Sequence, residues 1–576
     1  MPKKKPENNF NTCYMLKSNV NIHSWAYFIT LALIAMSIPL SKFAMSVTEF
    51  ILVGLWLWAG FRFRIVSRFF KIGGAFKGGR HLITYLARLA GNNFIDKFSL
   101  FFKNKPALIL SSIYLLHIIG LFNTSDLDYA LKDLRIKLPL LLYPVVISTM
   151  ETLKYKRFRL LMLFYLLSVF SGTIISFSFF LKGDFTDIRD ISPYISSIRF
   201  GLNASFSFFV LMYFIFHDNK FKTWHKIIFG TVALWIVVYL VLLESMTSLG
   251  IMLIISVSYL IWQLVRTKYF ALKIAILLLA AGIPLLLFVY VRNTVIDAST
   301  APAVNFDTLD KYTALGNPYS NDTISRGIEN GRYVGLYICE PELRKAWNKR
   351  SKLGYDSFPG GKHELKETLI RYLASKGLRK DASGVEALTD WDVRMIEQGV
   401  ANYNYVKKPG LRSRILKIMM GYEVYKKTGD PSGSSIMQRV EYLKASWYLL
   451  KKHFWLGVGT GDVEDSLINQ YKVMNSSLEK QFMFHAHNQF LSISITFGLF
   501  GFLWFLFALL YPPLKLRSFS DYFFLTFFII IIWSMLSDDT LETQAGVTLF
   551  AFFYTLLLFG KQKQNTPSGK IPKQAS

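Results

Sequence analysis

Long apolar runs alternate with short charged stretches along most of the chain. Most of these runs contain roughly 17–24 residues, and a helix of that length crosses the ~30 Å hydrocarbon layer of a membrane. The pattern predicts twelve spans, at residues 24–41, 43–61, 106–122, 138–150, 158–181, 200–216, 227–243, 248–265, 274–290, 489–511, 521–537 and 544–560. It excludes a soluble enzyme, an outer-membrane barrel and a disordered protein. We therefore predict an all-α, polytopic membrane protein.

The spacing of the runs divides the chain into three parts. Residues 1–290 carry nine of the predicted spans, and residues 489–576 carry three more and a tail. Residues 291–488 form one long segment between spans nine and ten. A connection of this length with helical patterns of its own is typical of a functional domain. The run at 138–150 is short, which predicts a tilted or re-entrant segment.

Helical patterns recur within residues 291–488. Thr389 and Asp392 are spaced as a capping box at the start of a helix. Residues 436–452 form the clearest amphipathic helix, whose predicted apolar stripe consists of Ile436, Val440, Leu443, Trp447 and Leu450. We therefore predict a helical domain here.

The distribution of charged residues predicts how the chain is oriented in the membrane. The 576 residues are 52% hydrophobic and carry a net charge of +28, which alone suggests a nucleic-acid partner. However, the basic stretches MPKKK, RFRIVSRFFK and KYKRFR fall on one side of the membrane when the N-terminus is placed inside. This bias is typical of cytoplasmic loops. We expect both termini in the cytoplasm, residues 291–488 on the opposite side, and no nucleic-acid partner.

The sharpest local pattern is FHAHNQFLSISITFGLFG. It puts His487 and Asn488 at the outer entrance of span ten, with Gly498 and Gly501 two and three turns further in. A histidine at a membrane interface is compatible with a purely structural role. The pair of His485 and His487 suggests a metal site, but no third ligand follows at a recognisable spacing. We expect neither a metal nor another cofactor.

Two arginines are candidates for binding an anion. Arg199 opens span six, where a charge near the membrane is costly and often functional. Arg439 lies about sixty degrees from the centre of the apolar stripe of its helix. Each could instead extend its side chain along the membrane edge to water. In the functional interpretation, the guanidinium forms a bidentate fork on phosphate oxygens.

Two further motifs have structural interpretations. WLGVGTGDVEDS contains three glycines but follows a helix, whereas a nucleotide-binding fingerprint requires a strand, a turn and then a helix. A tight turn that lets the chain pass close to other backbone is the favoured interpretation. The acidic turn SDDTLETQ connects the last two spans on the outer side, and we interpret it as a polar cap of these spans.

The string from His487 to Gly501 is His-Asn, nine residues, Gly, two residues, Gly. It resembles the signature of the O-antigen ligase family, part of a wider ligase and polymerase superfamily. About twelve spans and one large periplasmic loop before the signature are also similar to that family, as are QRVEYLKASWYLLKKHFWLGVGTGD and TSDLDYALKDLRIKLPLLLYP. One departure is LLESMTSLG, where Met246 follows Ser245 and relatives commonly have a Ser-Arg pair. A third family arginine therefore has no counterpart there.

The resemblance implies a metal-independent, inverting glycosyltransferase on the periplasmic face of a bacterial inner membrane. It would transfer O-antigen polysaccharide from undecaprenyl pyrophosphate to a sugar hydroxyl of lipid A-core, while membrane lipids surround its spans. His487 would be the base, Arg199 and Arg439 would bind the pyrophosphate, and Asn488 would orient the base or a sugar hydroxyl.

Three alternatives remain open. An O-antigen polymerase uses the same donor but usually has two sizeable periplasmic loops, whereas here the loop at 182–199 is short. A protein O-glycosyltransferase differs only in its acceptor. A lipid-linked oligosaccharide flippase would line a cavity with charges along several spans, and here the candidate residues gather at one outer face. The glycan, the acceptor sugar and the oligomeric state are not specified by the sequence.

Overall fold

The computed structural model describes residues 9–58, 94–183, 185–359 and 363–562, with side-chain surroundings from residue 22 onward. The basic stretches MPKKK and RFRIVSRFFK lie outside the described residues. Within the described part, the chain is mostly helical, and its one sheet is the two-stranded hairpin of β1 (Ile328–Glu329) and β2 (Arg332–Tyr333).

The N-terminal part of the chain supplies most of the helices that pack in the membrane region. In chain order they are α1 (Asn9–Ser37), α2 (Lys42–Trp58), α5 (Lys105–Ile119), η1 (Gly120–Asn123), α6 (Leu127–Lys137), α7 (Pro139–Thr149), α8 (Tyr155–Lys182), η2 (Ile188–Ile191), α9 (Ser197–Phe216), α10 (Thr223–Leu242), α11 (Met246–Arg266) and α12 (Phe270–Ser299). The C-terminal part adds α21 (Gln489–Lys515), η6 (Ser518–Ser520), α22 (Tyr522–Ser537), η7 (Thr540–Glu542), α23 (Gln544–Thr555) and the π-helical turn η8 (Leu556–Gly560).

Seven helices among the described residues are long and apolar enough to cross a membrane. They are Lys105–Asn123, Tyr155–Lys182, Ser197–Phe216, Thr223–Leu242, Met246–Arg266, Phe270–Ser299 and Gln489–Lys515. The chain is therefore a multi-pass membrane protein. The other five predicted spans are not among these seven helices, so the count of twelve stays a prediction. Helix α7, with 11 residues, is only about 16 Å long, too short to span alone.

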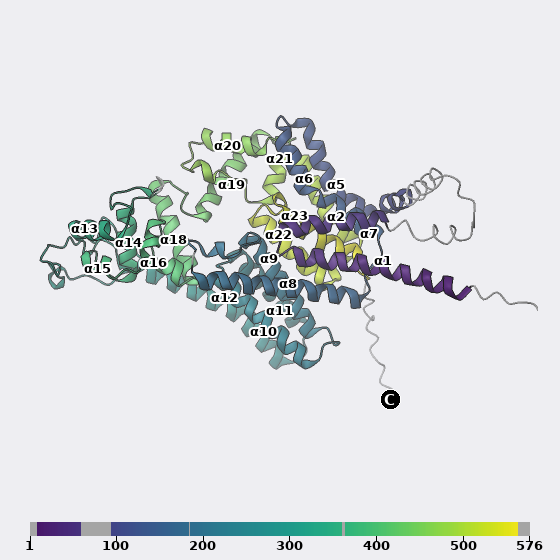
Figure 1. Ribbon diagram of the computed structural model, residues 1–576, viewed down its shortest axis with the longest axis horizontal. Coiled ribbons are helices and arrows are strands. Elements are labelled where there is room, and N and C mark those ends of the chain that lie inside the picture. Colours follow the sequence, from purple (N-terminus) through teal and green to yellow (C-terminus); the bar gives the residue numbers. More distant parts are fainter. Residues whose placement is uncertain (1–8, 59–93, 184, 360–362, 563–576) are drawn as a thin grey trace, which may run out of the picture.

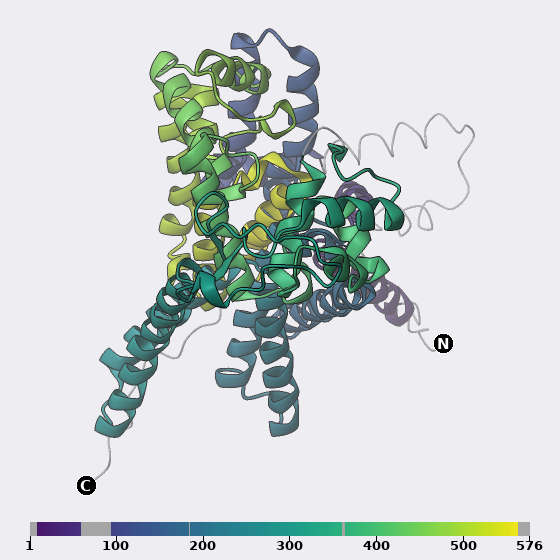
Figure 2. The ribbon, with the colours of Figure 1, turned by 90° about the vertical axis from the view of Figure 1, so that its left-hand side faces the viewer.

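The buried core of the membrane region surrounds α23. Every residue of α23 from Ala545 to Thr555 is buried, and the helix packs against α7 while α21 packs against α5. A helix that is apolar on all sides is typical of the centre of a bundle. By contrast, only 11% of the apolar stretch of α12 is buried, and this helix projects from the bundle (Figure 2). The turn before α23 is thereby fixed at the centre of the molecule.

Residues 300–488 form the loop domain. Its elements are η3 (Phe306–Thr308), β1 (Ile328–Glu329), β2 (Arg332–Tyr333), α13 (Glu340–Arg350), α14 (Leu365–Lys376), α15 (Ala382–Glu386), α16 (Asp390–Glu397), α17 (Asn404–Lys407), α18 (Leu411–Thr428), α19 (Ser435–Lys452), α20 (Val463–Val473) and η5 (Lys480–Phe482). The predicted capping box of Thr389 and Asp392 is confirmed at the start of α16. Helices α13–α16 gather at one end, with α18 between them and the membrane helices (Figure 1).

The predicted apolar stripe of α19 is not the face that the helix buries. The helix extends from Ser435 to Lys452 as expected, but Leu443 and Trp447 are 43% and 53% exposed. The buried face instead contains Met437, Glu441, Tyr442, Ala445, Ser446 and Leu449. Hydrogen bonds from Tyr425 (2.6 Å) and Ser476 (2.8 Å) to the Glu441 carboxylate compensate for burying its charge. The inward face therefore combines a satisfied carboxylate with Tyr442, Ala445 and Leu449, which pack in a hydrophobic cluster.

Candidate active site at the start of α21

Helix α21 begins at a cap that also joins it to α22. The Asn488 side-chain oxygen accepts a hydrogen bond from the Leu491 N–H (3.0 Å), and its amide nitrogen donates to the carbonyl oxygen of Leu536 (2.9 Å). His487, directly before this cap, has a backbone φ of +48°. Non-glycine residues rarely adopt this left-handed conformation, and such strain is concentrated at functional sites. Asn488 therefore fixes the backbone from which the His487 ring projects.

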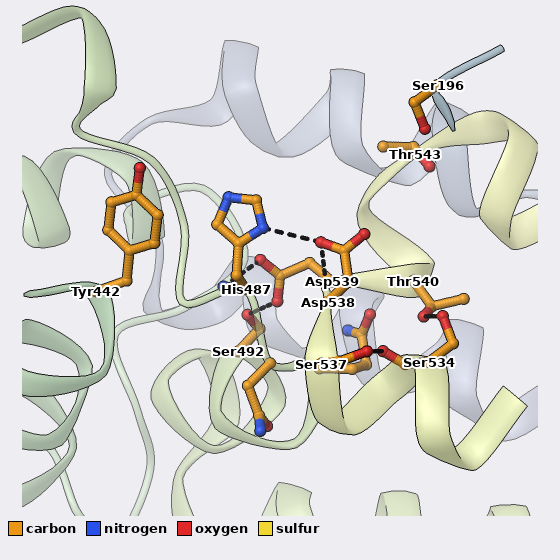
Figure 3. A network of polar contacts seen from close by, with 12 residues as sticks. Ser196, Tyr442, His487, Ser492, Ser534, Ser537, Asp538, Asp539, Thr540 and Thr543 are labelled. Atoms are coloured by element: carbon orange, nitrogen blue, oxygen red, sulfur yellow. Dashed lines mark hydrogen bonds and ion pairs between the residues drawn. The ribbon is translucent and has the colours of Figure 1, made fainter. Parts of the chain in front are cut away.

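The His487 ring contacts an acidic residue and an aromatic ring (Figure 3). Its Nδ1 atom lies 2.8 Å from Oδ1 of Asp538. Tyr442 of α19 stacks on the ring, with centroids 5.1 Å apart and planes inclined by 22°. The side chain is 29% exposed, and Nε2 has no hydrogen-bond partner among the described residues. The ring is thus oriented through one nitrogen while the other stays accessible.

Asp538 joins His487 to Arg199. Its second carboxylate oxygen forms a buried ion pair with Arg199, which also donates to the carbonyl oxygen of Asp539 (2.7 Å) and to Thr543 Oγ1 (3.3 Å). Burial alone would raise the pKa of Asp538, but the His487 hydrogen bond and the Arg199 charge lower it well below its usual range. The carboxylate is therefore ionised and accepts a hydrogen bond from Nδ1–H, an arrangement that puts the lone pair of a neutral imidazole on Nε2.

The neighbouring acid supports the backbone of the site. The Asp539 carboxylate accepts hydrogen bonds from the His487 backbone N–H (2.7 Å) and from Ser492 Oγ (2.7 Å). Burial raises the pKa of Asp539. On the next turn of the chain, Glu542 receives a hydrogen bond from Gln489 (2.9 Å). The acidic turn between α22 and α23 is therefore attached to the first turn of α21.

A buried lysine neutralises the far end of that turn. Lys137 Nζ lies 2.6 Å from Glu542 and 2.7 Å from Asp133. Burial opposes ionisation of Glu542, but the Lys137 charge outweighs it and lowers the pKa of Glu542 well below its usual range. The acidic turn was expected to be only a polar cap. It instead supplies the partners of His487, Arg199 and Lys137.

The glycine motif packs into a break in α21. At Gly498 the backbone leaves helical geometry, with φ +65° and ψ −165°, and the freed carbonyl oxygens of Ile495 and Thr496 accept N–H groups of Val458 and Gly459, both at 2.9 Å. A Cβ atom on Gly498 would lie 2.2 Å from the Trp455 carbonyl. This confirms the interpretation of the motif as a tight turn that passes close to other backbone.

Arg439 lies on α19, the helix that supplies Tyr442 to the site. It lies almost one helical turn before Tyr442, so both side chains share a face. Arg439 forms no hydrogen bond or ion pair with any described residue, although its charge lowers the pKa of the Tyr442 hydroxyl against the larger effect of burial. The structure therefore brings His487, Asn488 and Arg199 into one network and puts Arg439 beside it.

A cavity of about 520 Å³ adjoins this network. Lys42, Arg189, Tyr194 and Ser196 are among its lining residues. Ser196 caps α9, whose third residue is Arg199, and its side-chain oxygen accepts a hydrogen bond from the Arg199 N–H (3.4 Å). The volume is within the range of small-ligand sites.

The two histidines of the HAH motif have different partners. The His485 Nε2 atom lies 3.2 Å from the Tyr129 hydroxyl, whereas His487 contacts Asp538. Within the described part of the chain, no group of three or more His, Cys, Asp or Glu side chains is arranged to hold a metal ion.

Residues 400–506 match the family model of the O-antigen ligase. The matched segment includes α19 with Arg439, the glycine motif and the start of α21 with His487. No curated protein matches the chain. The family match confirms the resemblance drawn from the sequence and supports an O-antigen ligase or polymerase type of function.

Proposed function

We propose that this protein transfers O-antigen polysaccharide from undecaprenyl pyrophosphate to a sugar hydroxyl of lipid A-core. The observation that carries the proposal is the Asp538–His487 pair, which lies at the entrance of α21 and leaves Nε2 accessible. His487 belongs to the segment that matches the O-antigen ligase family. The donor sugar is already activated by its link to pyrophosphate, so the protein needs only to deprotonate the acceptor and stabilise the leaving group.

His487 acts as the general base. Its Nε2 atom removes the proton from the acceptor hydroxyl as that oxygen attacks the anomeric carbon. The resulting imidazolium is stabilised by the ionised Asp538 carboxylate at Nδ1. Attack occurs opposite the departing pyrophosphate, so the new glycosidic bond has inverted configuration.

The arginines stabilise the leaving group to different extents. Arg439, which has no carboxylate partner among the described residues, is available for charge-assisted hydrogen bonds to the pyrophosphate. Arg199 remains a candidate for the same anion because of its charge. Its contacts with Asp538, Asp539 and Thr543 additionally give it a positioning function for the base. Bonds that strengthen as negative charge develops accelerate the reaction.

Asn488 orients the base. Both polar groups of its side chain are engaged with backbone atoms of α21 and α22. It therefore acts on His487 through the backbone more readily than on a sugar hydroxyl.

The proposed setting is the bacterial inner membrane, with both termini in the cytoplasm and the loop domain in the periplasm. The polyprenyl tail of the donor enters laterally from the bilayer, while lipid A-core approaches from the same leaflet. No metal or organic cofactor takes part in the proposed reaction.

The choice of acceptor tests this proposal. The full-length protein is reconstituted in lipid with glycan-linked undecaprenyl pyrophosphate and lipid A-core, with and without a chelator. We expect glycan on lipid A-core in both cases. Glycan lengthening on the undecaprenyl carrier, with lipid A-core unmodified, would identify a polymerase. Transfer to a protein hydroxyl would identify a protein O-glycosyltransferase.

A further inference from the structure

Part of the loop domain exposes large apolar side chains next to the membrane helices. Helix α19 and the turn after it direct five of them outward, and these side chains are between 42% and 71% exposed. We call them the anchor surface: Trp447, Tyr448, Phe454, Trp455 and Leu456. Large exposed apolar patches mark interaction sites for proteins or membranes. The position of the anchor surface relative to the membrane helices indicates which of these partners it has.

The turn after α19 lies at one end of the membrane helix α5. The side-chain amide of Asn123 donates to the carbonyl oxygen of Gly457 (3.1 Å). The apolar segment Lys105–Asn123 has 19 residues, so as a helix it is about 28 Å long and nearly equals the thickness of the hydrocarbon layer. Its Asn123 end therefore lies at a membrane boundary. Leu456 directly precedes Gly457 and so lies at the same boundary.

A second membrane helix gives the same depth. The Leu499 N–H of α21 donates to the carbonyl oxygen of Phe454 (2.8 Å), directly after the break at Gly498. At the start of α21, by contrast, Tyr442 stacks on His487. Helix α19 therefore descends along α21 from the candidate active site toward the membrane, and the anchor surface is at its lower end.

The anchor surface continues into the side of α21 that faces lipid. The rings of Trp455 and Phe500 have centroids 5.7 Å apart, and Phe500 is 60% exposed. Leu503 and Phe507 follow at helical spacing and are 53% and 43% exposed. Such a row of apolar side chains on a membrane-spanning helix is covered by lipid acyl chains. Lipid that covers Phe500 therefore also reaches Trp455.

Two lysines give this end of α19 the composition of a membrane-interface segment. Lys451 and Lys452 are exposed and end the helix, and Lys451 Nζ lies 5.5 Å from the centre of the Trp447 ring. Tryptophan and tyrosine are enriched at membrane–water interfaces, and lysine extends its charge from apolar surface to the polar layer above. These side chains match a lipid leaflet, which presents phosphate groups above acyl chains.

We propose that the anchor surface inserts into the membrane leaflet on the side of the loop domain. Its two residues on α19 lie at headgroup level, and its three residues in the following turn lie at the acyl-chain boundary. A lipid partner explains why Trp447, part of the apolar stripe expected from the sequence, is exposed. The other side of α19 carries Tyr442, which stacks on His487. Lipid on one side of α19 and α21 on the other therefore hold Tyr442 in place.

Spin labels on single cysteines test the anchor. Cys13→Ser and Cys339→Ala remove the two native thiols, and Leu456→Cys or Tyr448→Cys then provides one site for a nitroxide label. The full-length protein is placed in nanodiscs of phosphatidylethanolamine and phosphatidylglycerol. Electron paramagnetic resonance measures how often the nitroxide collides with oxygen, which concentrates in lipid, and with a nickel chelate, which stays in water.

Leu315→Cys is the matched control for a label in water. Leu315 is apolar and 70% exposed. Thr313 of the same turn donates to Glu342 of α13, which lies at the end of the molecule away from α21 (Figure 1). We expect the ratio of oxygen to nickel collisions to be several-fold higher for Leu456→Cys than for Leu315→Cys. Tyr448→Cys, at headgroup level, should give a ratio between the two.

Two results would overturn the proposal. Equal ratios for Leu456→Cys and Leu315→Cys would show that the anchor surface faces water. Protection of Leu456→Cys from both oxygen and the nickel chelate would show that protein, such as a second copy of the chain, covers the surface instead of lipid.

Discussion

The Asp538→Asn variant tests how the base is held. In the protein, one carboxylate oxygen of Asp538 contacts His487 Nδ1 and the other pairs with Arg199. In the variant, the cationic donor Arg199 attracts the amide oxygen, which turns the amide NH₂ toward Nδ1. Nδ1 must then accept a hydrogen bond, so the proton of the neutral ring moves to Nε2. The side chain keeps its size, but Nε2 can no longer act as a base.

The expected loss follows from the contribution of a general base. Such catalysis supplies about 10²- to 10⁴-fold in rate, or ~3–5 kcal/mol of transition-state stabilisation. We expect kcat for transfer to lipid A-core to fall by that factor. The donor KM should change much less, because Asp538 contacts neither substrate in the proposed arrangement.

The assay compares initial rates of glycan transfer at several pH values. Asp390→Asn is the matched control, because the Asp390 side chain is 95% exposed and far from the site in sequence; its rate should equal that of the unmodified protein. A rate for Asp538→Asn within about threefold of the unmodified protein would refute the assignment of Asp538 as the partner that fixes the tautomer, since general-base catalysis supplies far more than this.

Three further predictions concern stability. Lys137→Met removes the cation that neutralises two buried carboxylates, and it should lower the free energy of unfolding by about 3–5 kcal/mol. Chemical unfolding in detergent measures this change. Lys132→Met, at an exposed position of the same helix, should have no comparable effect. Gly498→Ala puts a Cβ 2.2 Å from the Trp455 carbonyl at a φ of +65°, and it should lower the free energy of unfolding by about 3 kcal/mol or more. Gly282→Ala, with open space around it, should leave the free energy of unfolding nearly unchanged. Equal stability of the two variants would contradict the packing of the glycine motif. The pKa of Asp538 is depressed in the folded protein, so ionised Asp538 stabilises the folded state at pH values above the pKa of about 3.9 of an unfolded Asp. This stabilisation is lost progressively as the pH falls below about 3.9 toward the lower pKa of the folded state. The melting temperature should therefore decrease more between pH 5 and pH 3 in the unmodified protein than in Asp538→Asn.

Much of the architecture could be predicted from local patterns. Apolar runs correspond to helices because a segment that crosses the lipid must be both long enough and apolar enough as a helix. Seven of the predicted runs fall on helices of membrane length. The signature around His487 also gave its place at the start of a membrane helix. The short run at 138–150 was recognised as unusual, and α7 indeed has 11 residues.

The partners of His487 could not be predicted, because they depend on tertiary packing. Asp538 lies 51 residues away in sequence, and no local periodicity links the two positions. A signal existed in the acidic turn SDDTLETQ, which the predicted topology puts on the same side of the membrane as His487. Likewise, the buried face of α19 includes Glu441, which is hydrogen-bonded by Tyr425, and Tyr442, which stacks on His487; the hydrophobic pattern of the helix does not reveal these tertiary partners.

The most direct test of the account is the rate of glycan transfer to lipid A-core by His487→Ala beside His485→Ala. Both variants remove an imidazole from the HAH motif, but only His487 contacts Asp538. We expect His487→Ala to lose transfer, while His485→Ala and the unmodified protein form a product of inverted configuration. Transfer by His487→Ala at the rate of the unmodified protein, or a product of retained configuration, would contradict it.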